Sequence, residues 1–349
     1  MKVVLVSNGH GEDCIAVNIA LALLKEASSA TIEAYPLVGN GHSFSKENIP
    51  VKLQNPTFPS GGFIRSLSDA LNDISKGLFS HLKKQRRLIK SATENADIVI
   101  AVGDIFCLWQ TRNKAENTIF LPTAKSDTFM PHSGIEKWLI KRHSTLCLPR
   151  DEVTTESLSR SGINAYFFGN PMMDNLLDTN PLEENAPDNH HLIGILPGSR
   201  EEAYKNLRFI DSLIEKLDIN ATAIAAVSPS IDTSELSDIK HCTLSSQFKT
   251  IINKADVVIG LAGTANEQAA FLGKPVLCFP GFGPQSTAQR FEEQQKLMGS
   301  NIHFVNSQNK DVLLTKLNEL INQEKQPLPT TNQNAAQAIA KKILASQTP

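Results

Sequence analysis

The sequence lacks several features that mark common functional classes. Its formal net charge is -2, so it has no basic excess of the kind that nucleic-acid-binding proteins usually carry. Its five cysteines are scattered, odd in number and never spaced as Cys-x-x-Cys. This argues against a disulfide framework and a thiolate zinc site, and favours a reducing compartment. We expect no nucleic-acid partner, no metal and no organic cofactor.

Long hydrophobic runs are also missing. The first apolar run, at 2–6, is short and is followed at once by polar residues, so it does not resemble a signal peptide. No segment approaches the length of a transmembrane helix. We therefore expect a cytoplasmic protein. The 41% hydrophobic and 20% charged composition is typical of a soluble globular protein, and 349 residues are enough for two domains.

What the sequence does contain is an alternation of short apolar strands with amphipathic helices. A polar, proline-containing stretch at 180–191 divides it in two and predicts a linker. The pattern predicts an α/β fold with Rossmann-like domains at 1–178 and 190–330, and a helix in 331–349 that returns to the N-terminal domain. The expected strands are 3–6, 31–37, 97–102, 118–121, 145–148, 165–168, 193–196, 221–227, 242–244, 257–260, 276–279 and 302–305.

The first expected strand runs into the loop SNGHGED, which precedes a helix. Gly9 and Gly11 lack the third glycine of the dinucleotide fingerprint, and no acidic residue closes the second strand, so a nicotinamide dehydrogenase is disfavoured. The loop still collects His10, Glu12 and Asp13 at the carboxyl end of a strand, where open α/β sheets bind ligands. Alternatively, Glu12 and Asp13 only stabilise the start of the helix through its dipole. We favour a functional loop.

Another carboxylate follows the third expected strand. Asp104 comes directly after the strand and Gly103, where it can act as a general base toward a sugar hydroxyl. The alternative is that Asp104 caps the helix expected at 105–112. We favour the functional role because neighbouring loops point to the same edge of the sheet.

A long amphipathic segment lies between the second and third strands, after a stretch at 39–62 that predicts a long loop. Apolar residues recur at helical spacing from Ile64 onward, and the segment ends in KKQRR and Lys90. One hypothesis is a basic patch that rests on an anionic membrane. A helix packed on the core, with cations at its C-terminal end, is the more common arrangement.

Two turns in the second half have the chemistry of phosphate-binding loops. Gly198, Ser199 and Arg200 lie between an apolar strand and a helix, and offer backbone N–H groups and a guanidinium. Gly263 and Thr264 occupy the same place after the strand at 257–260. The alternatives are ordinary βα turns, with Arg200 in a surface ion pair. Glu267 and Gln268, one turn into the second helix, are at the right height for a ribose.

Read together, these blocks resemble a known family. Two Rossmann-like halves with phosphate-type turns in the second, and no Asp-x-Asp motif, are typical of GT-B glycosyltransferases. LPGSREE (196–202), FGNPMMD (168–174) and LAGTANEQAAFLGKPV (261–276) resemble blocks of lipid-A-disaccharide synthase. SNGHGED together with GPQST resembles an offshoot known as lipid-A-disaccharide synthase-related proteins. The similarity runs in order over nearly the whole chain.

The resemblance implies two domains that face a central cleft, and an inverting, metal-independent transfer of a sugar from a UDP-sugar to a lipid-linked or other amphipathic acceptor. Arg200 and the nearby amides would hold the diphosphate. Asp104 would be the general base, with Asp13 and His10 as alternatives. The segment from Ile64 to Lys90 would contact the membrane if the acceptor is a lipid. The expected substrate-binding residues are Gly9, Gly11, Glu12, Asn170, Gly198, Ser199, Arg200, Gly263, Thr264, Glu267, Gln268 and Gln285.

The sequence also departs from the synthase pattern. Gln268 stands where the synthase has glutamate, and the first loop is SNGHGED instead of a loop of small residues. Two other functions therefore stay open. One is a UDP-N-acetylglucosamine 2-epimerase-like isomerase or hydrolase, and the other is a non-catalytic nucleotide-sugar binder.

Overall fold

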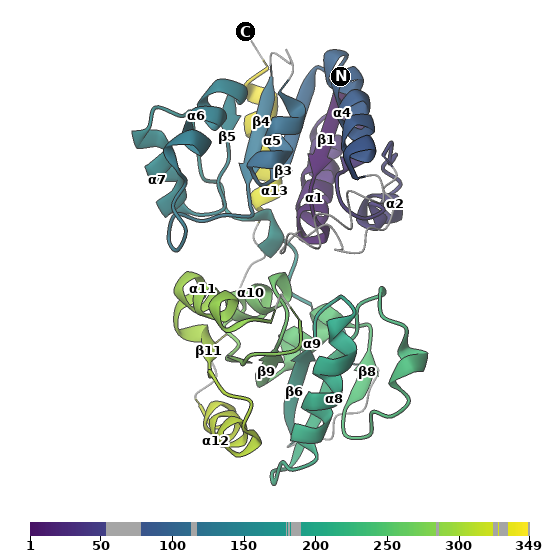
Figure 1. Cartoon of the computed structure of the whole chain (residues 1–349), viewed down its shortest axis with the longest axis vertical. Helices are drawn as coiled ribbons and strands as arrows, with labels where there is room; N and C mark the ends of the chain where they lie inside the picture. The colour runs from purple at the N-terminus through teal and green to yellow at the C-terminus, as the bar shows by residue number, and fades with distance from the viewer. Residues whose placement is uncertain are drawn as a thin grey trace. The chain divides into compact units, whose positions relative to one another are not determined.

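The computed structural model of the chain describes residues 1–53, 78–112, 117–178, 180, 182, 190–283, 286–323, 327 and 334–347. It divides into two compact units: unit 1 consists of Met1–Asp174 and Gln333–Pro349, and unit 2 of Asn175–Asn332. Each unit is a Rossmann-like α/β domain built on a parallel sheet (Figure 1). No helix in these described ranges is long and apolar enough to cross a membrane.

The sheet of unit 1 has five strands in the order β2-β1-β3-β4-β5. The chain goes from β1 to β2 on one side, and then crosses back over β1 to β3 on the other. The strand order therefore reverses between β1 and β3, which is where open α/β sheets bind ligands. The strands are β1 (Lys2–Ser7), β2 (Thr31–Pro36), β3 (Ile98–Gly103), β4 (Thr118–Pro122) and β5 (Leu146–Cys147).

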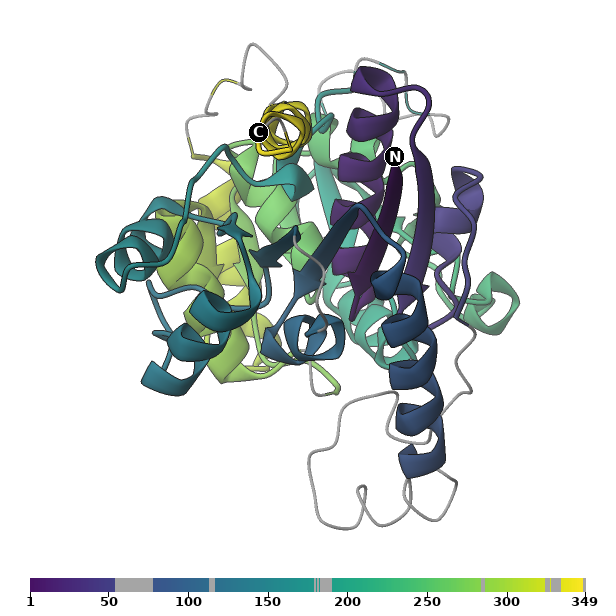
Figure 2. The ribbon, with the colours of Figure 1, turned by 90° about the horizontal axis from the view of Figure 1, so that it is seen from above.

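Helices cover both faces of this sheet. Val3 and Leu5 of β1 belong to a core shared with α1 and α13, whereas Val4 and Val6 belong to a core shared with α4, α5, α6 and α7. This alternation follows from the two-residue period of a strand, and Figure 2 shows α1 and α13 on the opposite side from α4 and α5. The helices are α1 (His10–Glu26), α2 (His42–Lys46), α4 (Leu78–Glu94), α5 (Ile105–Thr111), α6 (Gly134–His143), α7 (Glu152–Arg160), the 3-10 turn Pro171–Met173, and α13 (Ala335–Ala345).

Unit 2 repeats this plan with six parallel strands in the order β11-β10-β9-β6-β7-β8. Its order reverses between β6 and β9. The strands are β6 (His191–Leu196), β7 (Ala221–Ala226), β8 (Thr243–Ser245), β9 (Val257–Gly260), β10 (Val276–Cys278) and β11 (Ile302–Phe304). The helices are α8 (Glu202–Ile214), α9 (Phe248–Lys254), α10 (Thr264–Phe271), α11 (Ala288–Met298) and α12 (Lys310–Ile321), with 3-10 turns at Thr233–Leu236 and Gly299–Asn301.

Two local predictions from the sequence are wrong. The strand expected at 165–168 is reduced to a single bridge between Ala165 and Cys147, because β5 is only two residues long and Pro149 has no N–H to continue the pairing. The loop expected at 39–62 contains the short helix α2, which buries Phe44. The amphipathic segment is described only from Leu78, where α4 begins, so its first part from Ile64 to Gly77 lies outside the described residues.

Candidate functional site

The loops after β1 and β3 meet where the strand order of unit 1 reverses. Ser7 at the end of β1 lies beside Val102 of β3. Gly103 has φ +140°, and a Cβ placed there would be 2.0 Å from Oδ1 of Asn8. Glycine is needed at this position for both reasons, because a side chain would be strained and would displace the Asn8 carboxamide. The two loops are therefore in direct contact.

Asp13 of this site is buried rather than solvated. Its side chain has no exposed surface, and the Ser7 hydroxyl donates a hydrogen bond of 2.5 Å to its Oδ1. The pKa of Asp13 is raised to about 7, mainly because the side chain is buried; the Ser7 hydrogen bond opposes this rise, and the Glu12 charge adds a smaller contribution to it. Its other oxygen, Oδ2, is buried without a hydrogen bond to any residue that the structure describes. Glu12 folds back over Gly9, where a Cβ would lie 2.3 Å from Oε2.

Asp104 caps α5. One oxygen of its carboxylate, Oδ1, accepts hydrogen bonds from the backbone N–H groups of Phe106 (2.9 Å) and Cys107 (3.1 Å). This is the capping arrangement that the sequence offered as the alternative to a general base. Burial holds the pKa of the Cys107 thiol well above its ordinary value, and the charges of Asp104, Glu12 and Asp13 add to the effect. The carboxylates of Asp104, Glu12 and Asp13 therefore all lie near Cys107, at the same end of the sheet.

The remaining unit 1 residues that were expected at the site are His10, Gly11 and Asn170, and they lie in different surroundings. His10 begins α1, but its side chain lies outside the described residues, and Gly11 is in the first turn of the same helix. Asn170 is buried and caps the 3-10 turn Pro171–Met173 by accepting a hydrogen bond from the N–H of Met172. Its observed contact is thus structural.

In unit 2 the loops after β6 and β9 also meet where the strand order reverses. Leu196 pairs with Gly260, and the N–H of Leu261 donates to the Leu196 carbonyl (2.8 Å). Gly198 has φ +108°, a conformation that favours glycine, as the chain turns from β6 toward α8. Gly263 precedes α10, and a Cβ built there would have no atom within 4 Å. The space at the start of α10 is therefore open.

Buried amide side chains hold these loops in place. Asn206 of α8 donates to the Pro197 carbonyl (2.9 Å) and accepts from the N–H of Phe282 (2.7 Å). Asn266 of α10 donates to the Gly260 carbonyl (3.1 Å) and accepts from the N–H of Ala262 (3.3 Å). Both side chains are completely buried. The turns are thus fixed before any ligand binds.

A further layer supports the turn before α10. Gln294 of α11 donates to the Gly263 carbonyl (2.9 Å), and the Ser286 hydroxyl donates to the Leu261 carbonyl (3.0 Å). Glu267 in the first turn of α10 is buried, whereas Arg200, Thr264 and Gln268 are half-buried. Gln285 lies outside the described residues. The structure thus brings the Gly198–Arg200 and Gly263–Thr264 turns to one edge of the sheet, at the starts of two helices, which is an arrangement suited to phosphate groups.

The roles of the supporting amides were not predicted from the sequence. Asn206 and Asn266 lie inside helices, where asparagine is a poor helix former, and that is the only local signal of their role. A buried pair in the loop after β4, Asp127 and His132, was not predicted either. Their spacing of five residues in a predicted loop did not identify them.

Comparison with known proteins identifies the fold. No protein-family model matches the chain, and no curated protein matches it. The UDP-GlcNAc 2-epimerase from Neisseria meningitidis bound to UDP-GlcNAc is 15% identical and covers 99% of this chain and 100% of its own, with a TM-score of 0.59. MurG from Acinetobacter baumannii is 14% identical, with 99% of both chains covered and a TM-score of 0.55. CalG4, the calicheamicin glycosyltransferase, is 13% identical and covers 99% of this chain and 94% of its own, with a TM-score of 0.61.

The chain has the GT-B fold. The similarity spans both units, so it is not limited to one Rossmann-like domain. Both glycosyltransferases and UDP-GlcNAc 2-epimerases are among the structures that share the GT-B fold with this chain. At 13–15% identity these comparisons establish the fold, and the reaction has to be argued from the residues.

Proposed function

We propose that the protein is an enzyme that binds a UDP-sugar in unit 2 and transfers the sugar to a lipid-linked or other amphipathic acceptor, in the manner of lipid-A-disaccharide synthase. The observation that carries the proposal is the pair of turns after β6 and β9, where the strand order of unit 2 reverses. Two helix starts and an arginine meet there, which suits the two negative charges of a diphosphate.

On this proposal each turn has a separate role. Arg200 and the amides of Gly198 and Ser199 bind the diphosphate and stabilise the charge that develops on it as it leaves. Gly263 and Thr264 add amides from the start of α10, where the open space above Gly263 leaves room for a ligand. Glu267 and Gln268 bind the ribose hydroxyls, and Gln285 remains a further proposed substrate-binding residue.

The acceptor is proposed to bind at the strand ends of unit 1, against the loop that contains Gly9, Gly11 and Glu12. A hydroxyl group attacks the anomeric carbon of the sugar, and its proton must go to a base. Asp104 is proposed for this role, with Asp13 and His10 as alternatives. Inversion of the anomeric centre follows from a single displacement, and no metal is required when amides and Arg200 stabilise the leaving group.

An isomerase of the UDP-N-acetylglucosamine 2-epimerase type is the second candidate. Two structures with this fold are UDP-GlcNAc 2-epimerases bound to UDP-GlcNAc, one of them also to UDP. The same unit 2 turns suit that substrate, and epimerisation at C2 needs proton transfer by groups at the sugar. The carboxylates proposed for this proton transfer are Asp104, Asp13 and Glu12. Their charges all raise the pKa of Cys107, so they lie at one end of the unit 1 sheet.

Membrane contact is proposed for the outer surface of unit 1. Lys83, Lys84 and Arg87 of α4 are exposed, and the Arg86 guanidinium lies 5.8 Å from the ring centre of Trp109 on α5. Trp109 is 40% exposed, and Trp138 on the adjoining helix α6 is 61% exposed. Cations beside exposed tryptophans suit the interface of an anionic membrane. Flotation with vesicles of anionic lipid should be lost when the α4 cations are neutralised.

Nucleotide binding is the first test. UDP should raise the melting temperature of the wild-type protein more than GDP or NAD does, because a ligand that binds only the native state stabilises it. Arg200→Ala should lower the affinity for UDP at least tenfold, and the rise in melting temperature should become correspondingly smaller. Arg208→Ala is the matched control, since Arg208 lies on the outer side of α8 and pairs with Asp238. No stabilisation by any uridine nucleotide would refute the proposal.

The reaction is tested next. Incubation with UDP-N-acetylglucosamine alone should give no epimer if the protein is a transferase, and a new epimer if it is an isomerase. UDP release that increases on addition of a glycolipid acceptor supports transfer. A protein that binds UDP but consumes no UDP-sugar under either condition is a non-catalytic binder.

A further inference from the structure

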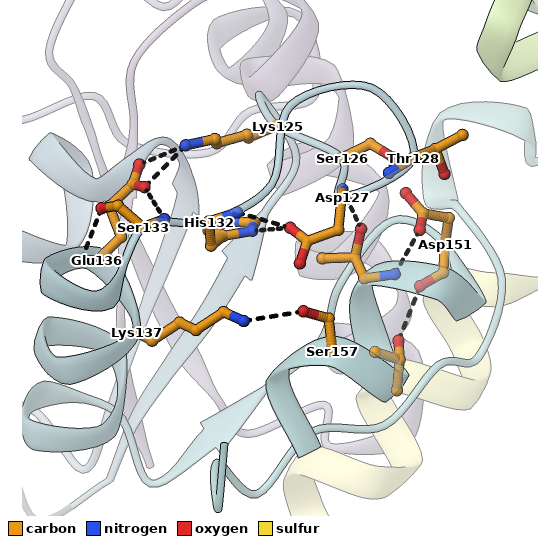
Figure 3. Close-up of polar contacts among 12 residues, drawn as sticks. Lys125, Ser126, Asp127, Thr128, His132, Ser133, Glu136, Lys137, Asp151 and Ser157 are labelled. Atoms are coloured by element: carbon orange, nitrogen blue, oxygen red, sulfur yellow. Dashed lines mark hydrogen bonds and ion pairs between the residues drawn. The ribbon is translucent and has the colours of Figure 1, made fainter. Parts of the chain in front are cut away.

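A buried aspartate–histidine pair lies in the loop that follows β4 of unit 1. The side chains of Asp127 and His132 are each only 4% exposed, and Nδ1 of His132 lies 2.5 Å from Oδ1 of Asp127. The backbone N–H of His132 donates to the same oxygen (2.9 Å). Figure 3 shows the imidazole ring directed at the Asp127 carboxylate.

The pair is held from several sides. The Thr154 hydroxyl of α7 accepts a hydrogen bond from the N–H of Asp127 (2.9 Å), and the N–H of Thr154 donates to Asp151 (2.7 Å). On α6, Glu136 forms an ion pair with Lys125 (2.7 Å), and Lys137 donates to the Ser157 hydroxyl (3.0 Å). Figure 3 shows the Lys125–Glu136 and Lys137–Ser157 pairs on either side of His132.

This arrangement fixes the proton on the histidine ring. Burial raises the pKa of Asp127, but the nearby Ser157 hydroxyl and the two hydrogen bonds from His132 outweigh it and hold the pKa below its ordinary value. An ionised carboxylate only accepts hydrogen bonds, so Nδ1 of His132 must carry a proton and donate it. In the neutral ring the lone pair then lies on Nε2. Within the described residues, Nε2 forms no hydrogen bond.

The loop that carries the pair begins at the carboxyl edge of the sheet, where the acceptor is proposed to bind. Its first residue is Thr123, whose N–H donates to the carbonyl of Gly103 (3.1 Å), the residue before Asp104. The Thr123 carbonyl accepts from Arg150, at the end of β5 (3.0 Å). The ends of β3, β4 and β5 are thus joined by hydrogen bonds, and the His132 loop starts directly beside the proposed acceptor site.

We propose that His132 is a catalytic residue that exchanges a proton with a sugar hydroxyl bound at this edge, and that Asp127 is its positioning residue. The inference rests on the proposed function. In transfer, the hydroxyl oxygen forms a bond to the anomeric carbon as the bond from that carbon to the diphosphate oxygen breaks. The bonding electrons leave with UDP, and the hydroxyl proton goes to Nε2. Asp127 stabilises the resulting imidazolium, as in other buried aspartate–histidine pairs.

On this proposal His132 replaces Asp104, the base first considered for the acceptor hydroxyl. Asp104 already accepts two backbone hydrogen bonds at the start of α5, so its Oδ1 is committed to capping that helix. His132 has its orientation and tautomer fixed while Nε2 stays available. A purely structural role, in which the pair only attaches the loop to α7, makes different predictions.

His132→Asn separates the two roles. The asparagine amide can donate to Asp127 from the position of Nδ1, so the loop contact is kept, but no base replaces Nε2. With UDP-N-acetylglucosamine and a glycolipid acceptor as substrates and release of UDP as the measurement, kcat should fall by about 100-fold or more. Unfolding temperature and UDP binding should not change. His143→Asn, at the other end of α6, is the matched control and should keep full activity.

The pH profile tests the positioning role. Asp127→Asn keeps an oxygen at Oδ1 but removes the charge that favours the imidazolium, so the acidic limb of the rate profile should move to lower pH. The other charged groups around the ring, Lys125, Glu136, Lys137 and Asp151, are unchanged in this variant. If the pair is only a structural contact, Asp127→Asn should lower the stability of the protein and leave the acidic limb of the rate profile at the same pH.

The outcomes are distinguishable. If the wild-type protein fails to bind UDP or consumes no UDP-sugar, the proposed function is wrong and this inference fails with it. If the wild type is active and His132→Asn is equally active, the inference alone is wrong. It is also wrong if Asp104→Asn abolishes activity while Asp127→Asn leaves the pH profile unchanged.

Discussion

Asp13 should make unit 1 less stable as pH rises, and its replacement by asparagine should remove this effect. The side chain is fully buried, and its folded-state pKa is raised from 3.8 to about 7. Between these values the folded chain keeps a proton that the unfolded chain has lost, so the free energy of unfolding falls as pH increases. The loss is absent below about pH 4 and complete above about pH 7.

The size of the effect follows from the pKa. The interval from 3.8 to about 7 corresponds to about 4 kcal/mol. Asparagine has nearly the same shape, its Oδ1 can accept the hydrogen bond from Ser7, and it does not ionise. Asp13→Asn should therefore exceed the wild type in stability by about 4 kcal/mol at pH 8, and match it near pH 4.

Urea unfolding followed by tryptophan fluorescence measures this difference. Both tryptophans of the chain, Trp109 and Trp138, are in α5 and α6 of unit 1, so the signal reports on the unit that contains Asp13. Glu12→Gln is the control and should give a smaller gain, because the Glu12 charge is a minor cause of the raised pKa. A stability difference between Asp13→Asn and wild type that does not change with pH would refute the reasoning.

Asn206→Ala should lower the stability of unit 2 by about 1–3 kcal/mol in thermal unfolding, since it leaves the Pro197 carbonyl and the Phe282 N–H without this partner. If the variant binds UDP as well as the wild type does, Asn206 has no role in fixing the turn for the nucleotide. Gly103→Ala should destabilise unit 1 by at least about 1–3 kcal/mol in urea unfolding, because of its positive φ and the contact with Asn8. Trp138→Ala should change the same unfolding free energy by less than about 0.5 kcal/mol, because the side chain is mostly exposed. It should weaken binding to anionic vesicles, and equal flotation of variant and wild type would argue against the membrane surface.

The sheet framework was predictable because its signals are local. Apolar runs such as 98–103 form central parallel strands, which are buried on both faces and so show no alternation in sequence. The turns at Gly198 and Gly263 were predictable for the same reason, since a strand, a glycine and a helix start are adjacent in the chain. The strand expected at 165–168 failed because its pairing depended on a partner, β5, that is too short.

The details of the site depend on contacts that the sequence does not display. Asn206 joins residues that are nine and 76 positions away, and nothing near it in the chain indicates either partner. Asp13 looks like a solvated residue of a polar loop, but packing against β1 buries it and changes its chemistry. Asp127 and His132 form their pair in a loop that Thr154 of α7 helps to hold in place. These features are set by tertiary packing, which overrides local pattern.

The way α13 begins has a consequence for how the chain is made. The Asp174 carboxylate, at the last residue before unit 2, accepts hydrogen bonds from the N–H groups of Ala335 (2.9 Å) and Ala336 (2.7 Å). The core of unit 1 includes Ile339 and Ile343 of this helix, which are synthesised after unit 2. On the ribosome, unit 2 should therefore reach its folded state before unit 1 can close its core. Because the two ends of unit 1 meet at Asp174, a short linker from there to Asn334 should yield unit 1 as one continuous polypeptide.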